Sequence, residues 1–184
     1  MAPSSFLLRT MAAVAPGTRV VDVACGDGVQ AHALARLGFD VHASAATPDE
    51  VDAARARLAD VHGADEAARR VTRARPDATG HDDASAPWVL ASRPTADVPL
   101  AAVFAEARRV LAPGGWLFSE VDGAGPDAHA LPLAERLDAD KQAAAALARA
   151  AIAADLAVAS LPTPDAARGT VAVIFRRVDA ATVG

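Results

Sequence analysis

Residues 20–50, VVDVACGDGVQAHALARLGFDVHASAATPDE, decide how the chain folds. The apolar run from Thr18 to Ala24 predicts a buried strand, and the turn after it contains Gly26 and Gly28. Helical spacing of apolar residues then predicts a helix that ends before Gly38, followed by a second strand at DVHAS. Glycine lets a turn approach a ligand closely, and a helix start supplies free N–H groups. The stretch therefore predicts a nucleotide-like ligand outside the carboxyl ends of parallel strands.

The composition is that of a globular protein, with 52% hydrophobic and 22% charged residues in 184. The net charge is −5, and the densest basic stretch is only residues 69–75, which disfavours nucleic acid as a partner. The single cysteine, Cys25, excludes an intrachain disulfide and a cysteine metal cluster, so we expect no metal site. The beginning of the chain is too interrupted for a signal peptide and no apolar run reaches about 18 residues. We therefore expect a cytoplasmic protein without a membrane partner.

Strand and helix patterns alternate along the chain, which predicts one domain over residues 1–184 with a parallel sheet covered on both faces. The clearest helix runs from Thr47 to Gly63, where Thr47 is the N-cap, Pro48 takes the first position and Glu50 completes a capping box. In the preceding helix, Ala33, Leu34 and Leu37 are predicted to face inward. Further strands are expected at residues 70–74, 87–92, 116–121, 156–162 and 170–178, helices at 98–115 and about 141–156, and a loop at 122–138.

Two kinds of cofactor site are compatible with the glycine turn. Gly26, Gly28 and Ala31 satisfy the permissive dinucleotide pattern G-x-G-x-x-G/A, although that pattern alone is weak. A dinucleotide fold also places an acid at the end of the second strand to bind the ribose. Here that strand ends in Ser44, Ala45 and Ala46, so the expected acid is absent.

The second interpretation uses more of the chain. The run Asp22, Gly26, Gly28 resembles the first motif of the class I S-adenosylmethionine (SAM)-dependent methyltransferases. Residues 106–121, EARRVLAPGGWLFSEV, look like the second signature of that family, and TVAVIFRRV resembles its closing strand. The resemblance covers about residues 6–178. It implies an α/β, three-layer Rossmann-like methyltransferase fold, with a mostly parallel seven-stranded sheet and an antiparallel last strand.

The resemblance also implies where SAM would bind. Its first motif falls on Asp22, Gly26 and Gly28, with Ala24 and Cys25 as small neighbours. Other cofactor positions fall on the end of the second strand and on the loop after the third strand, namely Ser44, Ala45, Asp77 and Ala78. The ribose acid of the family falls on Ala45, which cannot accept hydrogen bonds from hydroxyls. Loss of a charged acceptor costs roughly 1.5–3 kcal/mol, or about ten- to a hundredfold in affinity.

The methyl acceptor is expected at the carboxyl ends of the fourth and fifth strands. Five residues there or in nearby loops could position it or remove a proton: His81, Ser92, Arg93, Glu120 and His129. The family often carries phenylalanine-aspartate before the fourth strand, whereas this chain has Pro87 in place of that aspartate.

Two functions are compatible with these observations. The first is SAM-dependent methylation of a small molecule, as in the biosynthesis of a secondary metabolite. The second is a methyltransferase-fold protein that has lost methyl transfer, either a non-methylating enzyme such as a cyclase or lyase or an auxiliary binding subunit. The family motifs favour the first, and the departures at Ala45 and Pro87 keep the second as the alternative. The alanine-rich helices and the short regions available for a lid are compatible with a homodimer.

Overall fold

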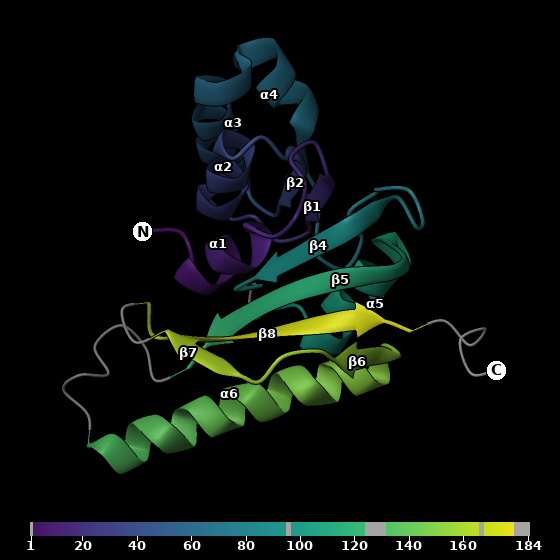
Figure 1. Cartoon of the computed structure of the whole chain (residues 1–184). Helices are drawn as coiled ribbons and strands as arrows, with labels where there is room; N and C mark the ends of the chain where they lie inside the picture. Colours follow the sequence, from purple (N-terminus) through teal and green to yellow (C-terminus); the bar gives the residue numbers. More distant parts are fainter. Residues whose placement is uncertain (1, 95–96, 124–131, 166–167, 179–184) are drawn as a thin grey trace.

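A computed structural model describes residues 2–94, 97–123, 132–165 and 168–178, which form a sheet with helices on both faces (Figure 1). The sheet has the strand order β3-β2-β1-β4-β5-β8-β6, and β7 also pairs with β8. Neighbouring strands from β3 to β5 are parallel, whereas β8 runs antiparallel to β5, β6 and β7. The strands are β1 (Arg19–Asp22), β2 (Asp40–Ala45), β3 (Val71–Arg73), β4 (Ala86–Ser92), β5 (Leu111–Asp122), β6 (Leu156–Val158), β7 (Thr163–Asp165) and β8 (Thr170–Arg177).

Helices cover the sheet in two separate layers. In Figure 1, α2 and α3 lie on one side of the sheet and the long α6 on the other. Consecutive residues of β1 show the division, because Val20 belongs to the buried cluster with α1, α2 and α3, and Val21 to the cluster with α5 and α6. The helices are α1 (Ser5–Met11), α2 (Val29–Arg36), α3 (Pro48–His62), α4 (Ala64–Arg70), α5 (Leu100–Val110) and α6 (Leu133–Ala153).

The predicted three-layer arrangement with an antiparallel strand near the end of the chain is confirmed. The capping box at the start of α3 is also confirmed. The Thr47 hydroxyl accepts from the Glu50 N–H, and the Glu50 carboxylate accepts from the Thr47 N–H at 3.0 Å. A capping box contributes stability because it pairs N–H groups that have no partner inside the helix.

Several local predictions were wrong. The sheet has an eighth strand, because the short β7 pairs with β8 beside β6, and α4 was not predicted. Helix α6 begins at Leu133, about eight residues before the expected start. Leu37 is 50% exposed instead of buried, because α2 turns Ala31, Leu34 and Ala35 toward the sheet.

Candidate cofactor and acceptor site

The site is built where the chain reverses its direction across the sheet. From β1 the chain crosses to β2 on one side, whereas β4 pairs with the other side of β1. The loop after β1, the end of β2 and the end of β4 therefore surround one crevice. Ligands of open α/β sheets bind in such a crevice, outside the carboxyl ends of the strands, so this is the place to search for a site.

The glycine loop takes backbone conformations that other residues adopt only with strain. Gly26 and Gly28 have φ values of 53° and 80°. A side chain on Gly28 would start 2.8 Å from the Cα of Ala54 in α3, so glycine is required for contact between the loop and that helix. A side chain on Gly26 would meet no atom within 4 Å. Gly28 thus fixes the position of the loop, and Gly26 leaves open space beside it for a ligand.

Asp22 lies behind the loop and is completely buried. One carboxylate oxygen accepts a hydrogen bond of 3.3 Å from the Ala24 N–H, and the other oxygen, Oδ2, has no partner among the described residues. Burial raises the pKa of Asp22 to about 7, because removal from water penalises the charged form more than the Ala24 hydrogen bond favours it. Asp22 therefore titrates near neutral pH and holds the start of the loop.

Cys25 is a buried free thiol in the same turn. Its N–H donates to the Ser44 carbonyl at 2.9 Å, which ties the loop to β2. Burial, followed by the nearby charge of Asp22, raises the pKa of the thiol well above its ordinary value. The thiolate is the nucleophilic form of cysteine, so the arrangement favours a small packing residue at this position.

Two cavities meet at the glycine loop. The smaller, about 30 Å³, lies between the loop and the ends of β2 and β3 and is lined by Val23, Ala24, Gly26, Ala45, Ala46, Glu50, Pro76 and Arg93. The larger, about 230 Å³, lies between the loop and the end of β4 and is lined by Cys25, Gly26, Asp27, Val29, Gln30, Ser92, Arg93 and Arg168. Gly26 and Arg93 line both, so the two cavities share a wall.

Glu50 supplies a carboxylate beside Ala45, where the sequence showed none. One of its oxygens, Oε2, accepts the Thr47 hydrogen bonds of the capping box, yet the side chain lines the smaller cavity together with Ala45. Its charge also contributes to the raised pKa of Cys25, which places it within electrostatic range of the loop. The first turn of α3 thus places a carboxylate in the cavity that Ala45 also lines.

Ser92 and Arg93 form the wall on the β4 side. The Ser92 Oγ is buried and has no hydrogen-bond partner among the described residues. Arg93 has a φ of 53°, a left-handed conformation that costs a side-chain-bearing residue about 1–2 kcal/mol. Its N–H donates to the Glu120 carbonyl at 2.7 Å, and its Nε lies 2.8 Å from an oxygen of Asp122. Backbone strain of this kind is concentrated at functional sites.

A sequence profile described as "Methyltransferase domain" matches residues 20–115, slightly more than half of the chain. The chain belongs to the methyltransferase domain family. This family membership and the α/β Rossmann-like fold confirm the sequence predictions, and SAM is the cofactor of the family, as predicted. No curated protein matches the sequence.

Solved structures of methyltransferases share the fold at low sequence identity. A geranyl diphosphate C-methyltransferase from Streptomyces coelicolor A3(2) is 16% identical, has a TM-score of 0.69, and aligns over 94% of this chain and 77% of its own. A SAM-dependent methyltransferase from Methanosarcina mazei is 12% identical with a TM-score of 0.66, and the alignment covers 97% and 99% of the two chains. One from Aquifex aeolicus is 15% identical with a TM-score of 0.67, covering 94% and 88%.

Glu120 was predicted as a candidate base of this methyltransferase. In the structure, its carboxylate is enclosed by hydrogen-bond donors. It is completely buried at the end of β5 and accepts hydrogen bonds from Gln30, Thr170 and Arg168, with the Arg168 Nε at 2.7 Å. Arg168 also donates to the Ala2 carbonyl, so the network ties the N-terminal segment to the sheet. Both oxygens of the Glu120 carboxylate are therefore occupied by donors of this network.

Of the two predicted histidines, the structure describes His81. His81 lies near Arg19, His42 and Arg109, around the amino ends of the strands and away from the glycine loop, and burial lowers the pKa of its imidazole. The loop that carries His81 meets the end of α5 at this edge, where the Ser85 N–H donates to the Val110 carbonyl. His129 lies outside the described residues.

Asp77 and Ala78, the predicted cofactor positions in the loop after the third strand, directly follow a residue that lines the smaller cavity. Asp77 forms an ion pair with Arg75 at 3.0 Å, and its neighbour Pro76 lines the cavity. The Ala78 N–H donates to the Arg75 carbonyl. Next to them Thr79 donates to Glu106 from its N–H at 2.8 Å and its hydroxyl at 2.6 Å. A hydrogen bond from Arg109, opposed by burial and assisted by Thr79, lowers the pKa of Glu106 to about 2, so this anchor stays charged.

Sequence reasoning missed Gln30, Arg168 and the cavity-facing role of Glu50. Gln30 had a detectable signal, since it follows Gly28 by two residues in the first turn of a helix next to the loop. Arg168 had no detectable signal in the sequence, because it reaches the site only through the antiparallel pairing of β8 with β5. Among the residues that the structure describes, no helix could span a membrane, and no three His, Cys, Asp or Glu residues gather to hold a metal ion.

Proposed function

We propose that the chain transfers the methyl group of SAM to a small-molecule acceptor. The observation that carries the proposal is the pair of cavities that meet at Gly26 and Arg93, outside the carboxyl ends of β1 and β4. The smaller cavity lies beside the glycine loop, where a nucleoside would bind once this space of about 30 Å³ opens, and the larger suits the reacting groups. The geranyl diphosphate enzyme, a structural neighbour, binds a small molecule in complex with S-adenosyl-L-homocysteine (SAH). A biosynthetic role in secondary metabolism is part of the proposal.

The residues present fit SAM. Gly26 leaves open space on the ligand side of the loop, and the start of α2 offers N–H groups there. Glu50 would accept hydrogen bonds from the ribose hydroxyls in place of an acid at Ala45. Arg93, between the two cavities, would bind an anionic group of the donor or acceptor, and the unpaired Ser92 hydroxyl would orient the acceptor.

The protein's contribution is mainly positioning. When bound, SAM supplies a methyl group on a sulfonium, which is already a good leaving group. The walls formed by Ser92, Arg93 and Gln30 then have to hold the acceptor in line and exclude water. With Glu120 engaged by Arg168 and His81 at the opposite edge of the sheet, we expect an acceptor atom that needs little help from a base.

A second candidate function, a methyltransferase-fold protein without methyl transfer, is favoured by the small volume of the nucleoside cavity and by Ala45. Calorimetric titration with SAM and SAH separates the two. Micromolar binding that Gly26→Arg abolishes supports the proposal. Gly17→Arg is the matched control, because Gly17 also has a positive φ and open space but lies outside the site. An absence of heat and of thermal stabilisation at millimolar SAM would favour the second candidate.

A further inference from the structure

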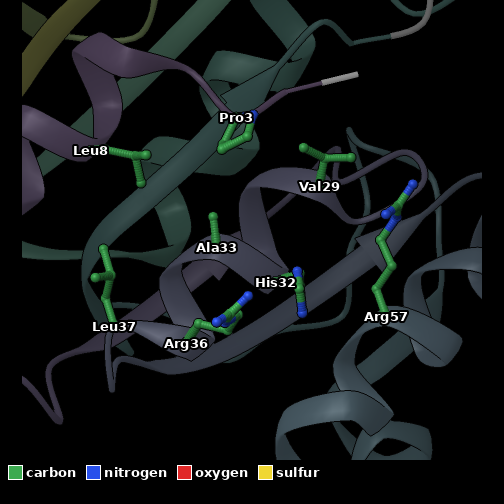
Figure 2. Close-up of a pocket in the computed structure, with 8 residues that line it drawn as sticks. All are labelled: Pro3, Leu8, Val29, His32, Ala33, Arg36, Leu37 and Arg57. Carbon is green, nitrogen blue, oxygen red and sulfur yellow. The ribbon is translucent and has the colours of Figure 1, made fainter.

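A separate groove lies on the outer face of α2, between α1 and α3 (Figure 2). Its volume is about 470 Å³, within the range of small-molecule sites. It shares Val29 with the larger cavity at the glycine loop, but it contains none of the predicted cofactor or catalytic residues.

One side of the groove is apolar. Figure 2 shows Leu8, Ala33 and Leu37 together on the side of α1. Leu37 is half-exposed, although the helical spacing of α2 predicts that it faces the core. An exposed leucine next to two other apolar side chains provides surface that an apolar ligand would cover, with a gain of roughly 25 cal/mol for each Å² removed from water.

The other side carries groups that bind anions. His32, Arg36 and Arg57 line it, and no acid partner is found for Arg36 within the described ranges. The His32 Nε2 is buried without a hydrogen-bond partner, and its nearest acid, Asp60, is 3.8 Å away. Arg57 is paired with Asp27 at 2.9 Å and the buried His32 Nε2 faces Asp60, which leaves Arg36 as the cation available to a ligand.

We propose that this groove binds a small amphiphilic carboxylate. The apolar body of the ligand lies against Leu8, Ala33 and Leu37, and its carboxylate pairs with the guanidinium of Arg36. The groove fits an amphiphilic carboxylate because an alcohol of equal length would leave the Arg36 guanidinium without an anion. A short carboxylate, in turn, would leave the leucines exposed.

The experiment uses the full chain and sodium decanoate, below the concentration at which it forms micelles. Calorimetry should detect binding of decanoate, with decanol and acetate each at least about tenfold weaker, since each lacks one of the two contacts. Arg36→Gln should weaken decanoate about tenfold. Ala33→Phe, which fills the groove from the half-buried face of α2, should abolish binding. Arg69→Gln, on exposed α4, is the control and should bind as the unmodified protein does.

Three results would overturn the proposal. One is equal affinity for decanol and decanoate, which would remove the role of the cation. Another is unchanged decanoate binding in both Arg36→Gln and Ala33→Phe, provided that circular dichroism shows both to be folded. The third is co-sedimentation with phosphatidylglycerol vesicles without binding of monomeric decanoate, which would identify a membrane surface instead. No step of the test uses SAM, so its failure leaves the proposed methyltransferase function untouched.

Discussion

Gly28 lies directly against Ala54, so that a Cβ at position 28 would stand 2.8 Å from the Ala54 Cα and 2.9 Å from its Cβ. This contact sets the distance between the glycine loop and α3. It therefore decides whether Glu50, one turn earlier on α3, reaches the cavity beside Ala45.

Gly28→Ala should destabilise the protein and weaken SAM binding. The left-handed φ alone costs about 1–2 kcal/mol, and the overlap with Ala54 adds a cost that requires α3 to move. Gly17→Ala has the same φ of 80° and meets no atom within 4 Å, so it isolates the backbone contribution. Urea unfolding of both variants measures the difference. Equal losses would show that α3 accommodates the extra methyl group.

Glu50→Gln should weaken SAM and SAH binding by about tenfold with little change in stability. Glutamine still completes a capping box with Thr47, so the substitution removes the charge and leaves the helix start intact. Thr47→Ala is the complementary control, since it costs about 1 kcal/mol of stability and keeps the carboxylate in the cavity. Calorimetry with unfolding curves distinguishes the two. If Glu50→Gln binds SAH as tightly as the unmodified protein, the ribose contact assigned to Glu50 is wrong.

Thr47 and Glu50 also show which features of the site can be predicted from the sequence. The capping box is a local pattern over Thr47 to Glu50, so four letters were enough to predict it. The same Glu50 faces the cavity because of how α3 packs against Gly28. This packing cannot be predicted from a local sequence pattern. The prediction that Leu37 faces the core was wrong for a related reason. Helical spacing defines a stripe, but the sheet and α1 decide which edge of that stripe is covered.

Stability should depend on the pH through Asp22. Its pKa is raised from 3.8 to about 7 by folding, so between these values the folded state holds a proton that the unfolded state has released. The free energy of unfolding therefore falls as the pH rises through this range, by about 1.4 kcal/mol per pH unit, and levels off above 7. Asp22→Asn keeps the oxygen that accepts from Ala24 and does not titrate.

The measurement compares urea unfolding of the unmodified protein and Asp22→Asn between pH 5 and pH 8. Other titrating groups contribute equally to both proteins, so the difference isolates Asp22. The unmodified protein should lose stability relative to the variant as the pH rises to about 7. Parallel curves over the whole range would mean that Asp22 ionises normally in the folded state.

Arg93→Gly should be more stable than Arg93→Ala by about 1 kcal/mol, reversing the usual order of these two residues. Both lose the ion pair with Asp122, but only glycine adopts the φ of 53° without strain. Both should lose SAH or acceptor affinity equally, because the guanidinium is absent from the shared wall of the cavities. If alanine is the more stable replacement, the left-handed backbone at position 93 is not maintained.

Glu120 and Arg168 should behave as a structural pair. Glu120→Gln leaves Arg168, which is 8% exposed, without a buried counter-charge, and such a loss costs about 3–5 kcal/mol. The double variant Glu120→Met/Arg168→Met removes both charges, so it should lose much less than the sum of the single losses. Urea unfolding gives the stabilities, and methylation of an acceptor, once one is found, gives the functional readout. A double variant that is folded and binds SAH but has no turnover would return Glu120 to the list of candidate bases. Glu120→Gln is therefore the cleaner test of a base, because Arg168, which lines the larger cavity, stays in place; SAH binding without turnover in that single variant would argue for Glu120 as the base.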